Sequence, residues 1–305
     1  MKCIVTGGAG FIGSHLTDKL IEKNYKVIVI DNLSAGRKEN VNPKAKFHQL
    51  DICDFEKIKP LFKGVDYVFH LAAIPRVPVS VLDPVLTSKV NILGTVNVFK
   101  AGIDAKVKRI IFASSSSVYG DQKKLPLEEN MTPNPLSPYA MQKLAGEQFA
   151  KLFVNLYKTP IICLRYFNVY GPRIDFNSDY SLVIGKFLKL NAQNQPLTIF
   201  GDGEQTRGFC YIDDVVEANI KTAESEKING GEIINVGSSK SYSINYLSKA
   251  IGGEVKYLPE RQGDIRYTEA DVSLAKNLLG WEPKIDFKDG VDLVKEWFQK
   301  NLNKL

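Results

Sequence analysis

The first two-thirds of the chain alternates short, almost wholly apolar runs with longer amphipathic stretches. An unbroken apolar run is typical of a strand that is buried on both faces, and strands of this kind alternating with helices indicate a parallel, doubly wound sheet. Strands are predicted at Lys2–Thr6, Lys26–Asp31, Lys46–Leu50, Tyr67–Leu71, Arg109–Ala113 and Ile161–Tyr166. Helical patterns fill the gaps, for example at Gly13–Lys23, Val90–Ala105 and Pro138–Tyr157.

The alternation of apolar runs and amphipathic stretches ends at about Gly171, and Pro, Gly and Asn become frequent after it. Shorter helices, such as Ser181–Asn191 and Asn245–Ile251, are mixed there with short extended pieces. The pattern predicts a first domain at 1–170, with 208–237 returning to it, and a smaller C-terminal α/β lobe at 171–305. Without a flexible linker or an internal repeat, the two parts are expected to pack tightly.

Composition narrows the possible partners. The net charge of +6 comes without a Lys/Arg run or interleaved aromatic and basic residues, so nucleic acid is not indicated. This charge suits an anionic small substrate and equally suits a lysine-rich surface. The chain enters a strand directly, without a targeting segment, and no apolar run is long enough to span a bilayer. We therefore expect a cytoplasmic protein without a membrane partner.

Metal and disulfide sites are not indicated either. The four cysteines lie far apart with no CxxC spacing, and the three histidines form no ligand-spaced cluster. The acidic pair Asp213–Asp214 is interpreted as a helix start, because carboxylates are favoured at helix N-termini.

A glycine-rich turn at 6–13 follows the first strand and opens a helix. Gly7, Gly10 and Gly13 permit a tight turn and close approach of a pyrophosphate, which the helix N-terminus would bind. Asp31 ends the next strand at the interval expected for a carboxylate that binds the ribose hydroxyls of NAD. The alternative is that the glycines only form a turn and that Asp31 only ends a strand. The glycine turn and Asp31 together favour a Rossmann-type domain that binds NAD rather than NADP.

Two further segments carry candidate chemistry. A run of serines, Ser114–Ser117, directly follows a predicted core strand, and Tyr139 and Lys143 occupy i and i+4 of a predicted helix. That spacing places both side chains on one helix face, where the ammonium is expected to lower the tyrosine pKa and create a general base. Each pattern alone is common, but their order after a dinucleotide turn is specific.

With these motifs the sequence resembles the extended short-chain dehydrogenases/reductases, in the nucleotide-sugar epimerase/dehydratase branch. The resemblance covers essentially the whole chain. It includes the segments His70–Ala73, Asn91–Thr95, Arg165–Pro172, Gly201–Arg207 and Arg261–Asp264.

The resemblance implies a role for each matching residue. Tyr139 would be the catalytic base, Lys143 would hold the nicotinamide ribose, and Ser115 would bond the reacting hydroxyl. The further cofactor contacts would be Phe11, Ile12, Asn32, Asp51, Ile52, Leu71, Ala72, Ala73 and Tyr166. The sugar nucleotide would meet Ser116, Asn168, Arg207, Arg261, Asp264 and Thr268.

The serine run also bears on the reaction. Dehydratases and decarboxylases of this branch carry an acidic residue there, whereas Ser115, Ser116 and Ser117 supply none. This resembles the UDP-hexose 4-epimerases. A small residue at Thr268 would admit an N-acetylated sugar, whereas Tyr267 in that place would exclude it. A UDP-glucuronate 4-epimerase, a sugar-nucleotide reductase and a non-catalytic NAD-binding protein remain alternatives.

Two further expectations follow from the resemblance. Gly208 replaces an Asp that is usual in the family, which would loosen the segment that holds Arg207. Relatives dimerise through a four-helix bundle, here Val90–Ala105 and Pro138–Tyr157, with Phe149, Leu152 and Phe153 as candidate contacts. The alternative is that these side chains pack on the protein's own sheet.

Overall fold

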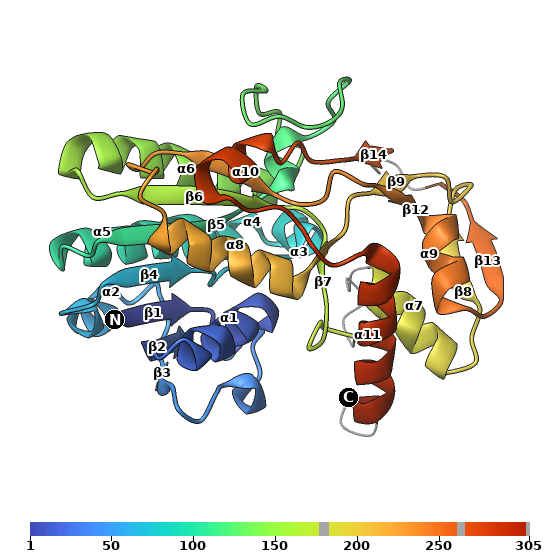
Figure 1. Cartoon of the computed structure of the whole chain (residues 1–305), viewed down its shortest axis with the longest axis horizontal. Coiled ribbons are helices and arrows are strands. Elements are labelled where there is room, and N and C mark those ends of the chain that lie inside the picture. Colours follow the sequence, from blue (N-terminus) through green and yellow to red (C-terminus); the bar gives the residue numbers. More distant parts are fainter. Residues whose placement is uncertain (177–182, 261–265, 303–305) are drawn as a thin grey trace.

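A seven-stranded parallel sheet forms the centre of the larger part of the molecule (Figure 1). The computed structural model describes residues 1–176, 183–260 and 266–302. The strand order is β11-β6-β5-β4-β1-β2-β3, so the order reverses at β1, where ligands bind in doubly wound sheets. The strands are β1 (Lys2–Thr6), β2 (Lys26–Asp31), β3 (Lys46–Gln49), β4 (Tyr67–His70), β5 (Arg109–Ser115), β6 (Ile161–Tyr166) and β11 (Ile233–Val236).

Alternate residues of these strands supply two separate cores. Cys3 and Val5 of β1 pack with Leu16 of the first helix, whereas Ile4 packs with Phe99 on the opposite face. The helices on the first face are α1 (Phe11–Glu22), α8 (Ile212–Glu224) and α10 (Ser273–Leu279), and those on the second are α2 (Phe55–Ile58), α5 (Thr95–Asp104) and α6 (Pro138–Tyr157). The predicted doubly wound α/β fold is therefore confirmed.

The predicted helices differ from the observed ones mainly at their starts. The stretch predicted as one helix at Val90–Ala105 is a π-helix, Lys89–Gly94, that continues into α5. In contrast, α6 has the predicted bounds, because Ser137 caps it by accepting a hydrogen bond from the Ala140 N–H at 3.2 Å and Pro138 fits the first turn.

The side chains proposed for a helical bundle divide into two groups. Phe149 and Phe153 pack in contact with the second core, and the Phe153 ring lies edge-on to Phe99 at 6.4 Å. Leu152 is 48% exposed. Phe149 and Phe153 are half-buried, so part of each side chain covers the chain's own core, as the alternative expected, and their contact with a partner stays a prediction.

The C-terminal region adds three small sheets beside the large one (Figure 1). They pair β10 with β7, β12 and β14 with β9, and β13 with β8. The strands are β7 (Val169–Tyr170), β8 (Leu197–Phe200), β9 (Thr206–Arg207), β10 (Cys210–Tyr211), β12 (Tyr242–Ser243), β13 (Val255–Leu258) and β14 (Tyr267–Thr268). The helices are α7 (Val183–Ala192), α9 (Ile244–Ile251) and α11 (Phe287–Asn301).

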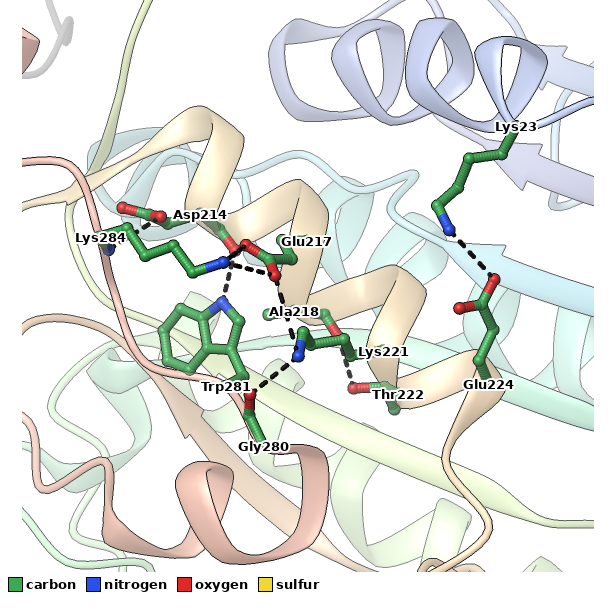
Figure 2. Close-up of polar contacts among 10 residues, drawn as sticks. All are labelled: Lys23, Asp214, Glu217, Ala218, Lys221, Thr222, Glu224, Gly280, Trp281 and Lys284. Carbon is green, nitrogen blue, oxygen red and sulfur yellow. Dashed lines mark hydrogen bonds and ion pairs between the residues drawn. The ribbon is translucent and has the colours of Figure 1, made fainter.

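Helix α8 joins the C-terminal segment to the large sheet (Figure 2). The Trp281 indole donates to the Asp214 carbonyl at 2.9 Å, and Lys221 Nζ donates to the Gly280 carbonyl at 2.8 Å. The Asp214 carboxylate accepts the backbone N–H of Lys284 at 3.0 Å. Asp213 and Asp214 lie in the first turn of α8, as predicted, and α10 packs on α8 and β11.

None of the described helices combines the length and the apolar character that crossing a membrane requires.

Candidate active site

A cavity of about 820 Å³ lies at the carboxyl ends of the central strands and reaches segments of the C-terminal region. Every predicted site residue within the described ranges lines it. These are Gly7, Gly10, Phe11, Ile12, Gly13, Asp31, Asn32, Asp51, Ile52, Leu71, Ala72, Ala73, Ser115, Ser116, Tyr139, Lys143, Tyr166, Asn168, Arg207 and Thr268. Arg261 and Asp264 lie outside the described residues.

The glycine turn fits a pyrophosphate for steric reasons. A Cβ on Gly13 would lie 2.2 Å from the Gly7 carbonyl oxygen, and one on Gly7 would lie 2.7 Å from the Ala72 nitrogen. Gly7 also has a φ of 73°, which favours glycine. A Cβ on Gly10 would meet only Gly7, so this side of the turn is open to the cavity, next to the N-terminus of α1.

The acidic residues at the carboxyl ends of β2 and β3 are held in place by hydrogen bonds. Asp31 accepts the N–H of Ala9 at 3.0 Å and that of Leu33 at 2.8 Å, so its carboxylate fixes the glycine turn while facing the cavity. Asn32 donates to Asp51 at 3.0 Å, which joins the two strand ends. A carboxylate has about four lone-pair sites, so Asp31 retains acceptor capacity for ribose hydroxyls.

The candidate catalytic side chains converge from β5 and α6. Lys143 is 4% exposed, and its Nζ donates to the Ala113 carbonyl at 2.7 Å and lies 5.8 Å from the Tyr139 ring centroid. Ser115 Oγ accepts the Ser117 N–H at 3.2 Å. The Tyr139 backbone N–H donates to Ser80 Oγ at 3.0 Å, which ties the start of α6 to α3 (Val77–Leu82).

The direction of the Tyr139 pKa corrects an expectation. Burial raises the pKa of Tyr139 to about 12, and hydrogen bonding to Ser115 only partly opposes this. Burial also lowers the pKa of Lys143 to about 8. The ammonium binds a backbone carbonyl rather than the phenol, so the described side chains alone do not bring Tyr139 towards neutrality.

The C-terminal side of the cavity is built from two-residue strands. Thr268 of β14 is paired with Arg207 of β9, and Asn168 Nδ2 donates to Thr268 Oγ1 at 3.3 Å. Thr268 lines the cavity, whereas its neighbour Tyr267 is 50% exposed and is not part of the lining. This is the alternation of side chains expected along a strand.

Gly208 is held more firmly than the sequence suggested. Its N–H donates to the Thr268 carbonyl at 2.7 Å, and its carbonyl accepts from Asn168 Nδ2 at 3.2 Å. A Cβ at this position would lie 3.0 Å from the Ser238 carbonyl oxygen. The expected loosening is therefore not found, because both backbone polar groups are hydrogen-bonded.

The cavity includes residues that the sequence analysis missed. Ser34, Ala35 and Gly36 line it directly after β2, and a small-residue turn at a strand's carboxyl end was an available signal. Arg76 and Asp175 also line it and form an ion pair. No local signal predicted this pair, because its members are far apart in the sequence.

The sequence model of the NAD dependent epimerase/dehydratase family matches residues 3–237. The chain belongs to this family. The resemblance found in the motifs is thereby confirmed. The family uses NAD, and the open glycine turn and the Asp31 carboxylate of this chain fit that cofactor.

Similar proteins match almost end to end. A Methanocaldococcus jannaschii protein, provisionally named a UDP-glucose 4-epimerase, is 44% identical over 98% of both chains. The crystal structure of Thermotoga maritima UDP-glucose 4-epimerase with UDP-glucose has a TM-score of 0.95 and 40% identity, covering 99% of this chain and 100% of the other. Methanobrevibacter ruminantium UDP-N-acetylglucosamine 4-epimerase, in complex with UDP-N-acetylmuramic acid, has a TM-score of 0.93 and 40% identity over 98% of both chains.

Proposed function

We propose that this chain is an NAD-dependent UDP-hexose 4-epimerase. The observation that carries the proposal is that one cavity holds the glycine turn, Asp31, Ser115, Tyr139 and Lys143. Ser115, Ser116 and Ser117, at the end of β5 and just after it, supply no acid to expel a hydroxyl, which favours epimerisation over elimination. The similar epimerases of nearly equal length support the same activity.

In the proposed reaction, Tyr139 removes the proton of the sugar 4-hydroxyl while Ser115 hydrogen-bonds the same oxygen. Bound NAD+ supplies a hydride acceptor for C4 and later a donor. Arg207 and Asn168 would hold the diphosphate while the 4-keto sugar rotates within the cavity and presents its other face. The hydride would then return to the opposite face of C4 while Tyr139 gives the proton back to the 4-oxygen, and this change of face inverts the configuration at C4. Binding energy concentrated on the nucleotide leaves the sugar free to turn.

We propose that the sugar pocket accepts N-acetylated and non-acetylated hexoses. Support comes from the side chain that faces the cavity, Thr268, which is smaller than Tyr267 beside it. The two similar solved structures name UDP-glucose and UDP-N-acetylglucosamine 4-epimerases.

The test is to incubate the purified protein without added cofactor with UDP-glucose, and separately with UDP-GlcNAc, and to follow the anomeric signals by proton NMR. Appearance of the galacto-configured sugar would support 4-epimerisation with retained NAD. If the protein converts UDP-glucuronate and neither of the other two substrates, the proposed substrate changes from a UDP-hexose to a UDP-uronate. No turnover of any of these substrates, even with NAD added, would favour a non-catalytic protein.

We further propose a homodimer through an apolar face of four neighbouring helices: α3, α4 (Pro84–Ser88), the π-helix and α6. Large apolar side chains in contiguous exposed patches are typical of interfaces. The exposed ones are Val81, Leu82, Val85, Leu86, Leu93, Met141, Leu152 and Leu156. Light scattering should give a dimer for the native chain and a monomer for Leu82→Glu with Val85→Glu. A monomeric native chain would overturn this.

The proposed compartment is the cytoplasm. All four cysteines are free thiols, which is typical of proteins in a reducing compartment.

A further inference from the structure

Glu147 extends the catalytic face of α6 by one more turn. It lies four residues after Lys143 and eight after Tyr139, a spacing that keeps all three side chains on one side of the helix. Tyr139 and Lys143 line the cavity, whereas Glu147 does not and is 0% exposed. It is therefore a buried charge directly behind the catalytic pair.

The Glu147 carboxylate is fully engaged by two strands. Ser114 Oγ of β5 donates to Oε1 at 2.6 Å. Arg165 of β6 donates to both oxygens, from Nε to Oε1 at 2.9 Å and from Nη2 to Oε2 at 2.7 Å. Ser114 and Arg165 are paired neighbours in the sheet, so the carboxylate fixes both strands where they end at the cavity.

The same carboxylate acts on the start of the serine run and on the segment just after it. Ser114 immediately precedes Ser115, the residue proposed to meet the reacting hydroxyl. The Arg165 guanidinium lies 4.4 Å from the ring centroid of Tyr119, two residues after the run, and the Tyr119 hydroxyl donates to Asn235 at 2.7 Å. Glu147 thus holds the start of the run directly and, through Arg165, contacts the segment that follows it.

A contribution to stability does not by itself explain the buried ion pair of Glu147 and Arg165. Replacing a buried ion pair by apolar residues of similar volume is often neutral or stabilising, because both charges lose their hydration. We propose that Glu147 is a positioning residue, which fixes the serine run relative to Tyr139 and maintains a negative charge next to Lys143.

The titratable groups around Lys143 determine which charge lies next to its ammonium. The titratable groups that face it are Tyr139 and Glu147 on α6, His70 on β4 and Cys163 on β6, with Arg165 beyond Glu147. Burial lowers the pKa of His70 to about 3 and raises that of Cys163, so both are neutral at neutral pH. Among the described groups around Lys143, Glu147 is thus the one that opposes loss of its proton.

Burial lowers the pKa of Lys143 to about 8, and, with the Cys163 thiol neutral, the Glu147 carboxylate keeps it from falling further. Removing the negative charge should lower this pKa again, so Lys143 would lose its proton at a lower pH. The alkaline limb of the pH profile should then move to lower pH.

The decisive variant is Glu147→Gln, which keeps an acceptor for Ser114 and removes the charge. The Lys143 titration can be followed in the holoenzyme by NMR of ¹³Cε-labelled lysine, with the signal assigned by its loss in Lys143→Ala. We expect the Lys143 midpoint and the alkaline limb of kcat to fall by about one pH unit or more. Glu296→Gln, an exposed glutamate on α11, is the matched control and should change neither. Unchanged values in Glu147→Gln would overturn the role of the charge.

A second variant tests the role in positioning independently of how well Glu147→Gln folds. Ser114→Ala removes one tie but leaves every charge, so kcat should fall about tenfold, with KM and the alkaline limb unchanged. Unaltered kcat would overturn that role. The inference rests on the proposed function only for turnover: if the native enzyme converts no UDP-hexose, the proposed function fails, while the lysine titration still tests Glu147.

Discussion

The two sides of the cavity are built differently. The proposed cofactor side rests on the strands of one parallel sheet, and its residues are cross-linked: Asp31 holds the glycine turn, and Lys143 is bound to the end of β5. The proposed nucleotide-sugar side rests on two-residue strands, with Arg207 and Thr268 paired across β9 and β14. Both sides line the same cavity.

This difference suits a reaction in which one partner stays fixed and the other turns. A continuous sheet holds backbone positions through many hydrogen bonds, so the catalytic atoms keep their geometry. Short strands supply a few side chains that, in the proposed function, would hold the nucleotide without enclosing the sugar in a rigid wall. The variants below test each side in turn.

The largest effect is expected from Tyr139→Phe on the cofactor side. Loss of the only proposed proton acceptor should reduce kcat by about a thousandfold, within the range of general acid–base catalysis, and leave NAD bound. Tyr157→Phe, near the exposed end of the same helix, is the matched control. Turnover of Tyr139→Phe within a few-fold of native would remove Tyr139 from the mechanism.

Gly13→Ala tests the glycine turn itself. The added Cβ would lie 2.2 Å from the Gly7 carbonyl, so the turn must shift. Overpacking of about 1–3 kcal/mol corresponds to roughly 5- to 150-fold weaker NAD binding, measurable by calorimetry. Gly185→Ala is the control, because its Cβ would have 3.5 Å of clearance. Native NAD affinity in Gly13→Ala would place the cofactor elsewhere.

Arg207→Met tests the nucleotide side. Losing a charge-assisted hydrogen bond of about 1.5–3 kcal/mol should raise KM roughly 10- to 100-fold. The effect on kcat should be small, because the diphosphate is remote from C4. Arg207→Lys keeps the positive charge but lacks the guanidinium fork, so its KM should lie between those of the native enzyme and Arg207→Met. A large loss of kcat with native KM would contradict this division of roles.

The smallest change is expected at the sugar pocket. Thr268→Tyr should lower kcat/KM for UDP-GlcNAc relative to UDP-glucose by about tenfold, because the larger ring fills space needed by the acetamide. Tyr267→Thr, outside the cavity lining, should leave that ratio unchanged. If the ratio responds to Tyr267 and not to Thr268, the assignment of the strand face is wrong.

Local patterns were sufficient to predict most of the Rossmann half. Buried parallel strands are apolar throughout, and a dinucleotide turn needs glycines at fixed positions, so β1, α1 and Asp31 could be found within short windows. The same holds for Tyr139 and Lys143, whose spacing follows from the helical repeat. Ser137 and Pro138 likewise determined where α6 begins.

What only the tertiary structure decided depends on residues far apart in the chain. The sequence could pair Lys143 with Tyr139, but the fold turned the ammonium towards the Ala113 carbonyl, and burial raised the Tyr139 pKa. The fold also brought Glu147 to Ser114 and Arg165. Burial and long-range pairing depend on the packed chain, so no short stretch of sequence reveals them. Periodicity and turn chemistry depend on neighbouring residues, so a short stretch is enough to predict them.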